Sequence, residues 1–482
     1  MISKIKNNKL WRLWCDLPLA VRTMIAIAAA SFFQSGMKLI FVPVFTRILT
    51  TSEYGVTTLF ESLQTTLGTI TMLSLSTSVY NRGMQEFKKD RDTFTSSLLV
   101  LSNLCTLVTA LFIFIFWDSL KDLIGLKWQY MVIMFANFLF LPAYNFWVAR
   151  QKFEYRYRGM LAVTVFINLF SPIVGIIMVL GNSDDPAFAK IIGSEIVLLI
   201  AYIPIYFYIM RGSRGKVKRK YISYGLKFNL PLVPHYASQQ ILSSCDRIMI
   251  AYLIDSASAG IYGLSYQVST VIRVLWSAIN AVLVPWEYDK IEAEKTEDIR
   301  KMTRFLIILY ALFCVALMFV APEMIRIFAP SSYHEGIYIM APVTAGVFFS
   351  GLYSLFAILE FYYKKNIYVM IASCISAISN IILNWIFIPI YGYQAAAYTT
   401  LACYALYAML HAFNLKRLKI DYFYDMKAIG LLSVAVILIS LIVVHTYDGY
   451  GCMIRYGLLC CLAVLFIRKR QVLLTALQSM RK

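Results

Sequence analysis

Apolar runs of about 20 residues recur along the whole of this 482-residue chain. A helix of about 20 apolar residues crosses the hydrocarbon core of a bilayer. Helices are also the only open-ended elements that satisfy their own backbone hydrogen bonds there. Only 15% of the residues are charged, whereas soluble proteins carry about 25%. We therefore expect an all-α polytopic membrane protein.

Hydropathy divides the chain into fourteen predicted transmembrane helices. They cover residues 20–46, 55–80, 94–117, 128–149, 157–181, 187–210, 224–254, 260–286, 303–328, 336–361, 367–390, 392–415, 428–446 and 450–467. On one side of the membrane the connections are short, from about three to ten residues. They leave no room on that side for a folded catalytic domain.

Basic residues gather in alternate connections. The two termini and residues 82–91, 150–158, 211–227, 290–304, 364–365 and 416–427 hold 36 of the 45 Lys and Arg residues, and the opposite connections hold only Arg47, Lys121 and Lys127. Because basic loops stay on the cytoplasmic side, both termini are expected to be cytoplasmic. This bias explains most of the net charge of +19, so no nucleic-acid partner is needed to account for it.

Neither the cysteines nor the N-terminus indicates a further function. The nine cysteines form no CxxC pair, and most fall in apolar runs, so we interpret them as small buried residues and expect no metal or other cofactor. The basic N-terminal segment lacks the apolar core of a cleavable signal peptide. We expect it to lie at the membrane interface, anchored by Trp11 and Trp14.

A faint internal repeat surrounds the most basic connection, RGSRGKVKRK at 211–220. An ungapped offset of 205 aligns Gln34 with Gln239, Gly55 with Gly260, and Thr65 with Thr270. Two six-helix halves of the same orientation would form a parallel repeat, as in some transporters. We predict an N-terminal lobe at 1–215, a C-terminal lobe at 216–425, and two further helices with a cytoplasmic tail at 426–482.

Four predicted helices carry polar stripes. In QQILSSCDRI at 239–248, a helical turn of 100° per residue places Gln239, Gln240, Ser243, Ser244 and Arg247 on one face, with Asp246 at its edge. Similar stripes are Ser31, Gln34, Ser35 and Lys38; Glu61, Gln64, Thr65 and Gly68; and Tyr266, Ser269, Thr270 and Arg273. Exposing a central charge to lipid costs about 2.5–3.5 kcal/mol, so these faces are expected to line a water-filled cavity or to meet one another.

Two interpretations of the charges in these stripes remain open. In one, Lys38 pairs with Glu61, and Arg247 pairs with Asp246 or its neighbours, across tight helix contacts. In the other, the slightly positive balance, completed by Arg273, suits an anionic or phosphate-bearing cargo.

Four stretches carry a resemblance to a known family. They are TRILTTSEYGVTTLF at 46–60, ARQKFEYRYRGML at 149–161, CDRIMIAYLIDSASAGIYGLSYQV at 245–268 and NWIFIPIYGYQAAAYTT at 384–400. The chain resembles the O-antigen and capsule repeat-unit flippases of the multidrug/oligosaccharidyl-lipid/polysaccharide exporter superfamily. The third stretch is the most specific, with Asp246, Arg247, Gly260, Ile261 and Tyr262 at the matching positions.

The resemblance implies a MATE-like fold and transport by alternating access. The cargo would be an undecaprenyl-pyrophosphate-linked oligosaccharide, moved across the bacterial cytoplasmic membrane for O-antigen, capsule or exopolysaccharide synthesis. The implied partners are this cargo, membrane lipids and other polysaccharide-assembly proteins, and the expected state is a monomer.

The candidate cavity residues combine the resemblance with the polar stripes. The family's cationic lumen is matched by Lys38, Arg247 and Arg273, and Arg47 lies at the outer mouth. Gln34, Glu61 and Gln240 complete the set, together with Asp246, which we interpret as a structural partner.

Three alternatives remain. A drug or cation exporter of the same superfamily would use Glu61, the one good acidic candidate in the N-terminal half. A lipid II flippase would share the helix count and the cationic cavity. A membrane enzyme such as a polymerase or ligase would need a long loop with catalytic groups, but the outer connections are short and the four histidines are dispersed. We therefore expect no enzymatic activity.

Overall fold

The computed structural model describes residues 18–181 and 184–468, so the predicted interfacial segment with Trp11 and Trp14 lies outside the described residues. The chain packs into two compact units: residues up to Ile48 with Leu63–Tyr236, and Leu49–Ser62 with the residues from Ala237 onward. The described residues contain helices and no strand. The expected all-α class is confirmed.

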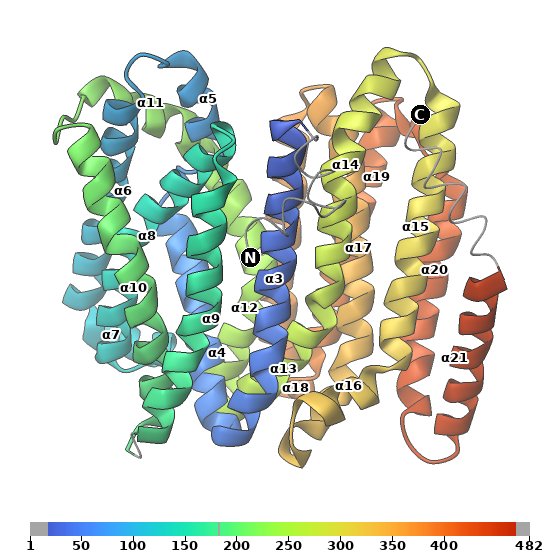
Figure 1. Ribbon diagram of the computed structural model, residues 1–482. Coiled ribbons are helices and arrows are strands. Elements are labelled where there is room, and N and C mark those ends of the chain that lie inside the picture. Colours follow the sequence, from blue (N-terminus) through green and yellow to red (C-terminus); the bar gives the residue numbers. More distant parts are fainter. Residues whose placement is uncertain (1–17, 182–183, 469–482) are drawn as a thin grey trace, which may run out of the picture. The chain divides into compact units, whose positions relative to one another are not determined.

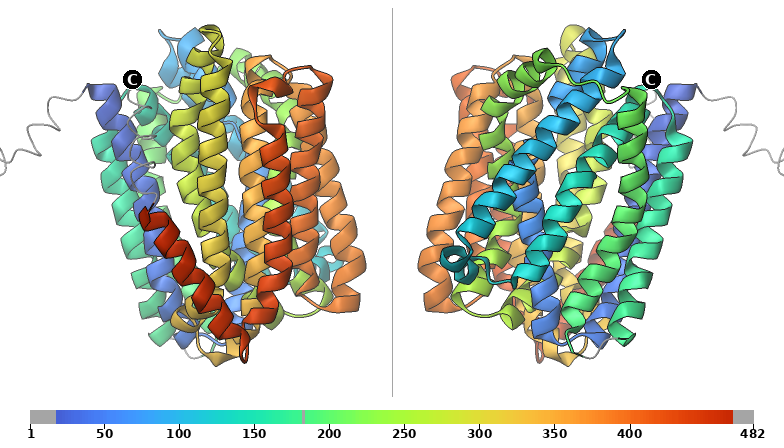
Figure 2. Two further views of the ribbon diagram at one scale, coloured as in Figure 1. Left: turned by 90° about the vertical axis from the view of Figure 1, so that its right-hand side faces the viewer. Right: turned by 90° about the vertical axis from the view of Figure 1, so that its left-hand side faces the viewer.

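The first unit is a layer of long helices with short helices at their ends (Figure 1). Its helices are α3 (Leu19–Ile48), the second half of α4 (Thr51–Thr71), α5 (Ser78–Glu86), α6 (Arg91–Ile115), α7 (Trp117–Ile124), α8 (Trp128–Phe153), α9 (Tyr157–Gly181), α10 (Pro186–Gly212), α11 (Arg219–Asn229) and the single turn η1 (Leu230–Leu232). Helix α9 packs between α3 and α10, and α8 packs between α10 and α6 (Figure 2, right).

The second unit is centred on α17. Besides the first half of α4, it contains α12 (Val233–Leu253), α13 (Ser256–Ser269), η2 (Thr270–Ile272), α14 (Arg273–Glu292), α15 (Thr296–Phe319), α16 (Ala321–Phe328), η3 (Ser331–Gly336), α17 (Ile337–Tyr362), α18 (Asn366–Tyr391), α19 (Ala395–Arg417), η4 (Asp421–Phe423), α20 (Met426–Val443), η5 (Val444–Thr446) and α21 (Gly451–Arg468). Helix α17 packs against α13, α15, α19 and α20, and α21 lies against α15; α15, α20 and α21 face the viewer in Figure 2, left.

Ten helical segments of the described chain are long and apolar enough to cross a membrane. Three of the remaining predicted spans, 55–80, 224–254 and 392–415, correspond to α4, α12 and α19, which are less apolar. In α21 the side chains are described only for Gly451–Cys460, an apolar segment shorter than a membrane span. The protein is a multi-pass membrane protein, and the count of fourteen spans stays a prediction. The lobe boundaries at 215 and 425 also stay predictions, since the units are groups defined by packing.

Several predicted spans are interrupted in the structure. Helix α4 ends at Thr71, where the span was expected to run to residue 80, because Leu73 and Ser74 adopt positive φ angles of 52° and 47°. The buried Asn229 side chain donates a hydrogen bond to the Leu73 carbonyl and holds this turn. The single turns η1 and η2 interrupt the spans predicted at 224–254 and 260–286, and η1 contains Pro231, which lacks a backbone N–H donor.

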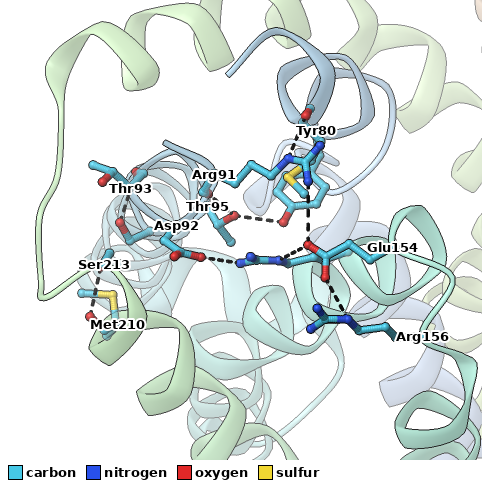
Figure 3. Close-up of polar contacts among 12 residues, drawn as sticks. Tyr80, Arg91, Asp92, Thr93, Thr95, Glu154, Arg156, Met210 and Ser213 are labelled. Carbon is cyan, nitrogen blue, oxygen red and sulfur yellow. Dashed lines mark hydrogen bonds and ion pairs between the residues drawn. The ribbon is translucent and has the colours of Figure 1, made fainter. Parts of the chain in front are cut away.

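Basic connections that are far apart in sequence meet at one end of the first unit. Arg150, at the end of α8, contacts Asp92 at 2.5 Å and Glu154 at 2.9 Å. Lys218, ahead of α11, contacts Asp90 at 2.5 Å. Figure 3 shows Arg91 and Arg156 converging on Glu154 in the same network. The second, fourth and sixth connections therefore lie on one side of this unit, as the alternation of basic residues predicts.

The weakly basic connections of the first unit meet at the other end of its helices. Lys127, ahead of α8, contacts Asp185, ahead of α10, at 2.9 Å. In the second unit, Arg304 of α15 contacts Asp425 at the start of α20 at 3.2 Å, which joins two basic connections in the same way. The order of helices through the membrane thus agrees with the charge pattern within each unit.

The offset of 205 residues has a geometric counterpart within the second unit. Helix α4 begins at Thr51 and α13 at Ser256. A methyl group on Gly55 would lie 1.7 Å from the Ser256 carbonyl oxygen, and one on Gly260 would lie 2.4 Å from the Thr51 carbonyl oxygen. Gly55 and Gly260 differ by 205 residues, and so do Thr51 and Ser256. The two helices therefore cross at two glycines that the repeat relates to each other, and these glycines allow the two backbones to touch.

The N-caps of these two helices follow the same offset. The Thr50 hydroxyl accepts a hydrogen bond from the Glu53 amide, and the Glu53 carboxylate accepts one from the Thr50 amide, which is a capping box. Asp255 accepts one from the Ser258 amide at 2.7 Å. The two residues cap α4 and α13 at equivalent positions, which supports a parallel repeat.

Candidate functional site

Two predicted cavity arginines lie together in the second unit. Arg247 of α12 places its guanidinium carbon 4.4 Å from the centre of the Tyr266 ring, and Arg273 of α14 places its own at 5.8 Å. The Tyr266 ring is 6% exposed, whereas both arginines are half-buried. Cation–π contact with an aromatic face becomes stronger as the pair loses water, to about 2 kcal/mol or more. The ring therefore holds two guanidinium groups close together.

The break at η2 positions Arg273. The α13 helix ends at Ser269, one 3-10 turn follows, and Arg273 is the first residue of α14. Its Nη2 donates to the hydroxyl of Tyr404 at 3.0 Å and to that of Tyr266 at 3.3 Å. Its Nε has no hydrogen-bond partner among the described residues.

Arg247 is positioned by two hydroxyl-bearing neighbours. Its Nε donates to the Ser62 hydroxyl at 2.9 Å, and its Nη2 donates to the Ser243 carbonyl one turn earlier in α12. No carboxylate lies within ion-pair distance of Arg247 or Arg273 in the part of the chain that the structure describes. The pair is therefore a cationic group without a paired carboxylate.

The rest of the α12 stripe binds within the same unit. Gln240 donates to the Ser244 hydroxyl at 2.7 Å. Gln239 donates to the Tyr407 hydroxyl at 3.0 Å and accepts from the Tyr353 hydroxyl at 3.0 Å. The stripe predicted from helical periodicity is thus extended by tyrosines of α17 and α19.

Asp246 belongs to a different network. It is fully buried and accepts hydrogen bonds from Tyr262 at 2.9 Å, Asn384 at 2.8 Å and Thr400 at 2.6 Å. These donors come from α13, α18 and α19. Asp246 and Arg247 therefore have separate partners, and the surroundings of Asp246 are those of a carboxylate that joins helices.

The other predicted cavity residues lie on α3 and α4. Gln34, Lys38 and Arg47 are exposed side chains of α3 in the first unit, and Arg47 donates to the Pro43 carbonyl at 2.8 Å. Glu61 is exposed on the part of α4 that belongs to the second unit. Whether these residues share a cavity with the arginine pair stays a prediction.

A buried polar cluster in the first unit escaped the sequence prediction. Glu195 of α10 is 5% exposed and accepts hydrogen bonds from Asn137 at 2.5 Å and Gln64 at 2.9 Å. Five residues earlier in α10, the Lys190 ammonium lies 5.1 Å from the centre of the Phe45 ring. Charged residues inside an apolar run are a recognised signal of a functional site, and the run at 187–210 contains these two.

Tyr404 also escaped the sequence prediction, because nothing in an apolar run distinguishes a tyrosine that binds an arginine from one that fills the core.

The basic end of the first unit holds a pocket of about 300 Å³ beside the network in Figure 3, lined in part by Tyr80, Trp147, Arg150 and Arg211. None of the predicted cavity residues lines it. In the described residues, no group of three or more His, Cys, Asp or Glu side chains could hold a metal ion.

Comparisons with known proteins agree on the class. The family model described as polysaccharide biosynthesis protein matches residues 20–289. Protein 1 of the Lsg locus of Haemophilus influenzae is 28% identical over 162 residues, which are 33% of this chain and 39% of that protein. The match thus spans about two fifths of the length of this curated relative.

Solved structures show the same fold. The lipid II flippase MurJ in its inward closed conformation matches with a TM-score of 0.66 at 18% identity, over 93% of this chain and 100% of that chain. An inward-facing MATE family transporter of the MOP superfamily matches with a TM-score of 0.65 at 13% identity, over 81% of this chain and 95% of that chain. The predicted MATE-like fold is confirmed, and the chain belongs to the family described as polysaccharide biosynthesis protein.

Proposed function

We propose that the protein flips an undecaprenyl-pyrophosphate-linked oligosaccharide repeat unit across the bacterial cytoplasmic membrane by alternating access. The product is used for a surface polysaccharide such as O-antigen, capsule or exopolysaccharide. The arginine pair around Tyr266 is the observation that carries this proposal. Family membership supports the flippase class, and the pair supports an anionic cargo.

The chemistry of the pair suits pyrophosphate. A guanidinium presents a planar fork of donors that matches two oxygens of a phosphate group. Arg247 and Arg273 both contact the buried Tyr266 ring, which keeps the positive charges close enough to act on neighbouring phosphates. A cationic drug would be repelled by the same pair, so the geometry favours the lipid-linked cargo over the drug-exporter alternative.

The orientation and the state of assembly are part of the same proposal. Both termini lie in the cytoplasm, because the strongly basic connections meet at one end of the first unit and such loops stay inside. The protein works as a monomer with membrane lipids and other polysaccharide-assembly proteins as partners. It moves its cargo without making or breaking a covalent bond, so it is not an enzyme, and it needs no cofactor.

Complementation of a flippase-deficient strain tests the proposal. Arg247→Gln and Arg273→Gln should abolish surface polysaccharide at unchanged protein level. Arg273→Lys should restore it only in part, because an ammonium keeps the charge but loses the fork. Arg300→Gln, at an exposed arginine of α15 in the same unit, is the matched control. Normal polysaccharide in both glutamine variants would show that the pair does not bind the cargo.

A further inference from the structure

A second buried group in the second unit is separate from the arginine pair. His411 of α19 and Glu360 of α17 are both fully buried, and His411 Nδ1 lies 2.5 Å from Glu360 Oε2. At this distance one proton lies between the two atoms, because two bare acceptors would repel each other. With Nε2 bare, the pair is a neutral imidazole that donates to a carboxylate, and its net charge is −1; one further proton makes the pair neutral.

Tyrosines surround this pair. The Tyr407 ring centre lies 4.9 Å from that of His411, and the Tyr353 ring stacks on His411 at 5.8 Å. Both tyrosine hydroxyls bind the amide of Gln239 in the α12 stripe. The pair is thus connected to the helix that carries Arg247 through one layer of side chains.

Other titratable groups reach the pair from neighbouring elements. Tyr424, after η4, interacts electrostatically with Glu360 and donates a hydrogen bond to Glu287 of α14 at 2.5 Å. Glu287 is fully buried too. Arg273 interacts electrostatically with Tyr353. The pair is joined to no lysine or arginine by an ion pair within the described ranges, so only a further bound proton would neutralise it.

Two atoms of the pair have unused hydrogen-bonding capacity. Glu360 Oε1 and His411 Nε2 have no partner among the described residues. Leaving a buried polar atom unsatisfied costs about 1–3 kcal/mol, and an apolar pair of the same volume would avoid that cost. Histidine and carboxylate groups inside a membrane commonly relay protons, and histidine changes charge between about pH 5 and 8.

We propose that His411 and Glu360 form a proton-binding site that drives the transport cycle, an inference that rests on the proposed flippase function. The deprotonated pair, a neutral imidazole beside a carboxylate, has a net charge of −1. Binding one proton from water at the free Nε2 gives a neutral pair, because the imidazole and the carboxylate then hold two protons between them. Both groups are fully buried, so the proton exchanges with water only when the site opens. Opening on one side and then on the other moves one proton along with the conformational change.

Proton binding is tested on the purified full-length protein, without cargo. Histidine NMR and the infrared carboxylic-acid band are followed from about pH 5 to 8, with His411→Gln and Glu360→Gln to identify the two signals. We expect each substitution to displace the titration of the remaining partner. His445→Gln and Glu335→Gln, at exposed positions of the same unit, should displace neither. If neither group changes protonation over this range, the inference is wrong.

Coupling is tested in cells. Both single variants should lose surface polysaccharide, and any residual transport should no longer respond to collapse of the proton gradient. Thermal unfolding identifies any single variant that fails to fold. The double variant His411→Gln/Glu360→Gln then takes the place of that variant, because it leaves no buried charge unpaired. Normal gradient dependence in the folded variants would overturn the coupling. Failure of the flippase proposal is distinguishable, because the arginine variants would then make normal surface polysaccharide while the titration of His411 and Glu360 stayed the same.

Discussion

Replacing Asp246 separates a structural carboxylate from a cargo contact. Three hydroxyl or amide donors from three helices converge on this carboxylate, and it is fully buried. Asp246→Ala removes all three hydrogen bonds and leaves Tyr262, Asn384 and Thr400 without their acceptor. Asp246→Asn keeps the volume and one acceptor oxygen, but it turns an amide donor toward one of the three donors.

The expected loss follows from these contacts. A hydrogen bond between transmembrane helices contributes about 0.6 kcal/mol on average and at most about 1.7 kcal/mol. Three such bonds predict that Asp246→Ala lowers the free energy of unfolding by about 2 kcal/mol, with about 5 kcal/mol as the upper bound. Asp246→Asn should fall between this variant and the wild type. Arg247→Gln should cost less stability, because that side chain is half-buried, and yet should abolish transport.

The assay measures reversible unfolding of the purified protein in mixed detergent micelles, together with surface polysaccharide per folded molecule in complemented cells. We expect Asp246→Ala to be unstable but, per folded molecule, active. The opposite pattern, unchanged stability with lost transport, would show that Asp246 touches the cargo. In that case the assignment of different roles to two adjacent charges would be wrong.

Three further predictions test contacts within the fold. Gly55→Ala or Gly260→Ala should destabilise the second unit by about 1–3 kcal/mol, since each methyl group meets a backbone oxygen; Gly430→Ala, with open space around it, is the unfolding control. Arg455→Met should speed amide exchange in residues 451–460, because Arg455 is 1% exposed and binds both Glu323 oxygens at 2.6 Å. Each hydrogen bond to a charged group contributes about 1.5–3 kcal/mol. Unchanged exchange would mean that other contacts hold α21 in place. The hydrogen bond from Lys218 lowers the pKa of Asp90 from its ordinary 3.8 to about 2, so the stabilisation is complete above the higher value and is lost as the pH falls toward the lower one. Pepsin should therefore cut the 213–218 connection of Asp90→Asn faster than that of the wild type at pH 4, and the two rates should converge near pH 2; equal rates at both pH values would contradict the assignment.

The sequence was sufficient to predict the all-α class and the two faces of α12, but not the partners of the side chains on those faces. Apolar runs and helical periodicity are local, and they place Gln239, Gln240 and Arg247 on one side and Asp246 at its edge without knowledge of the fold. Tyr404 binds Arg273 across 131 residues of sequence, and no local pattern specifies such a pair. The breaks at η1 and η2 also escaped prediction. Each break changes the mean hydropathy of its apolar run very little, although η2 sets the position of Arg273.

The repeat shows why side-chain identity is a poor record of internal symmetry in this chain. At an offset of 205 residues few identities remain, and alone they would not distinguish a repeat from chance. The structure adds a reciprocal contact: Gly55 meets the residue that precedes Gly260 by four, and Gly260 meets the residue that precedes Gly55 by four. Such a contact arises when two copies of one segment face each other across a twofold axis, because each copy must then present the same surface. A glycine is the one residue that a touching backbone requires at that point. The constraint therefore preserves two glycines and two helix starts, while lipid-facing positions are free to exchange one apolar residue for another.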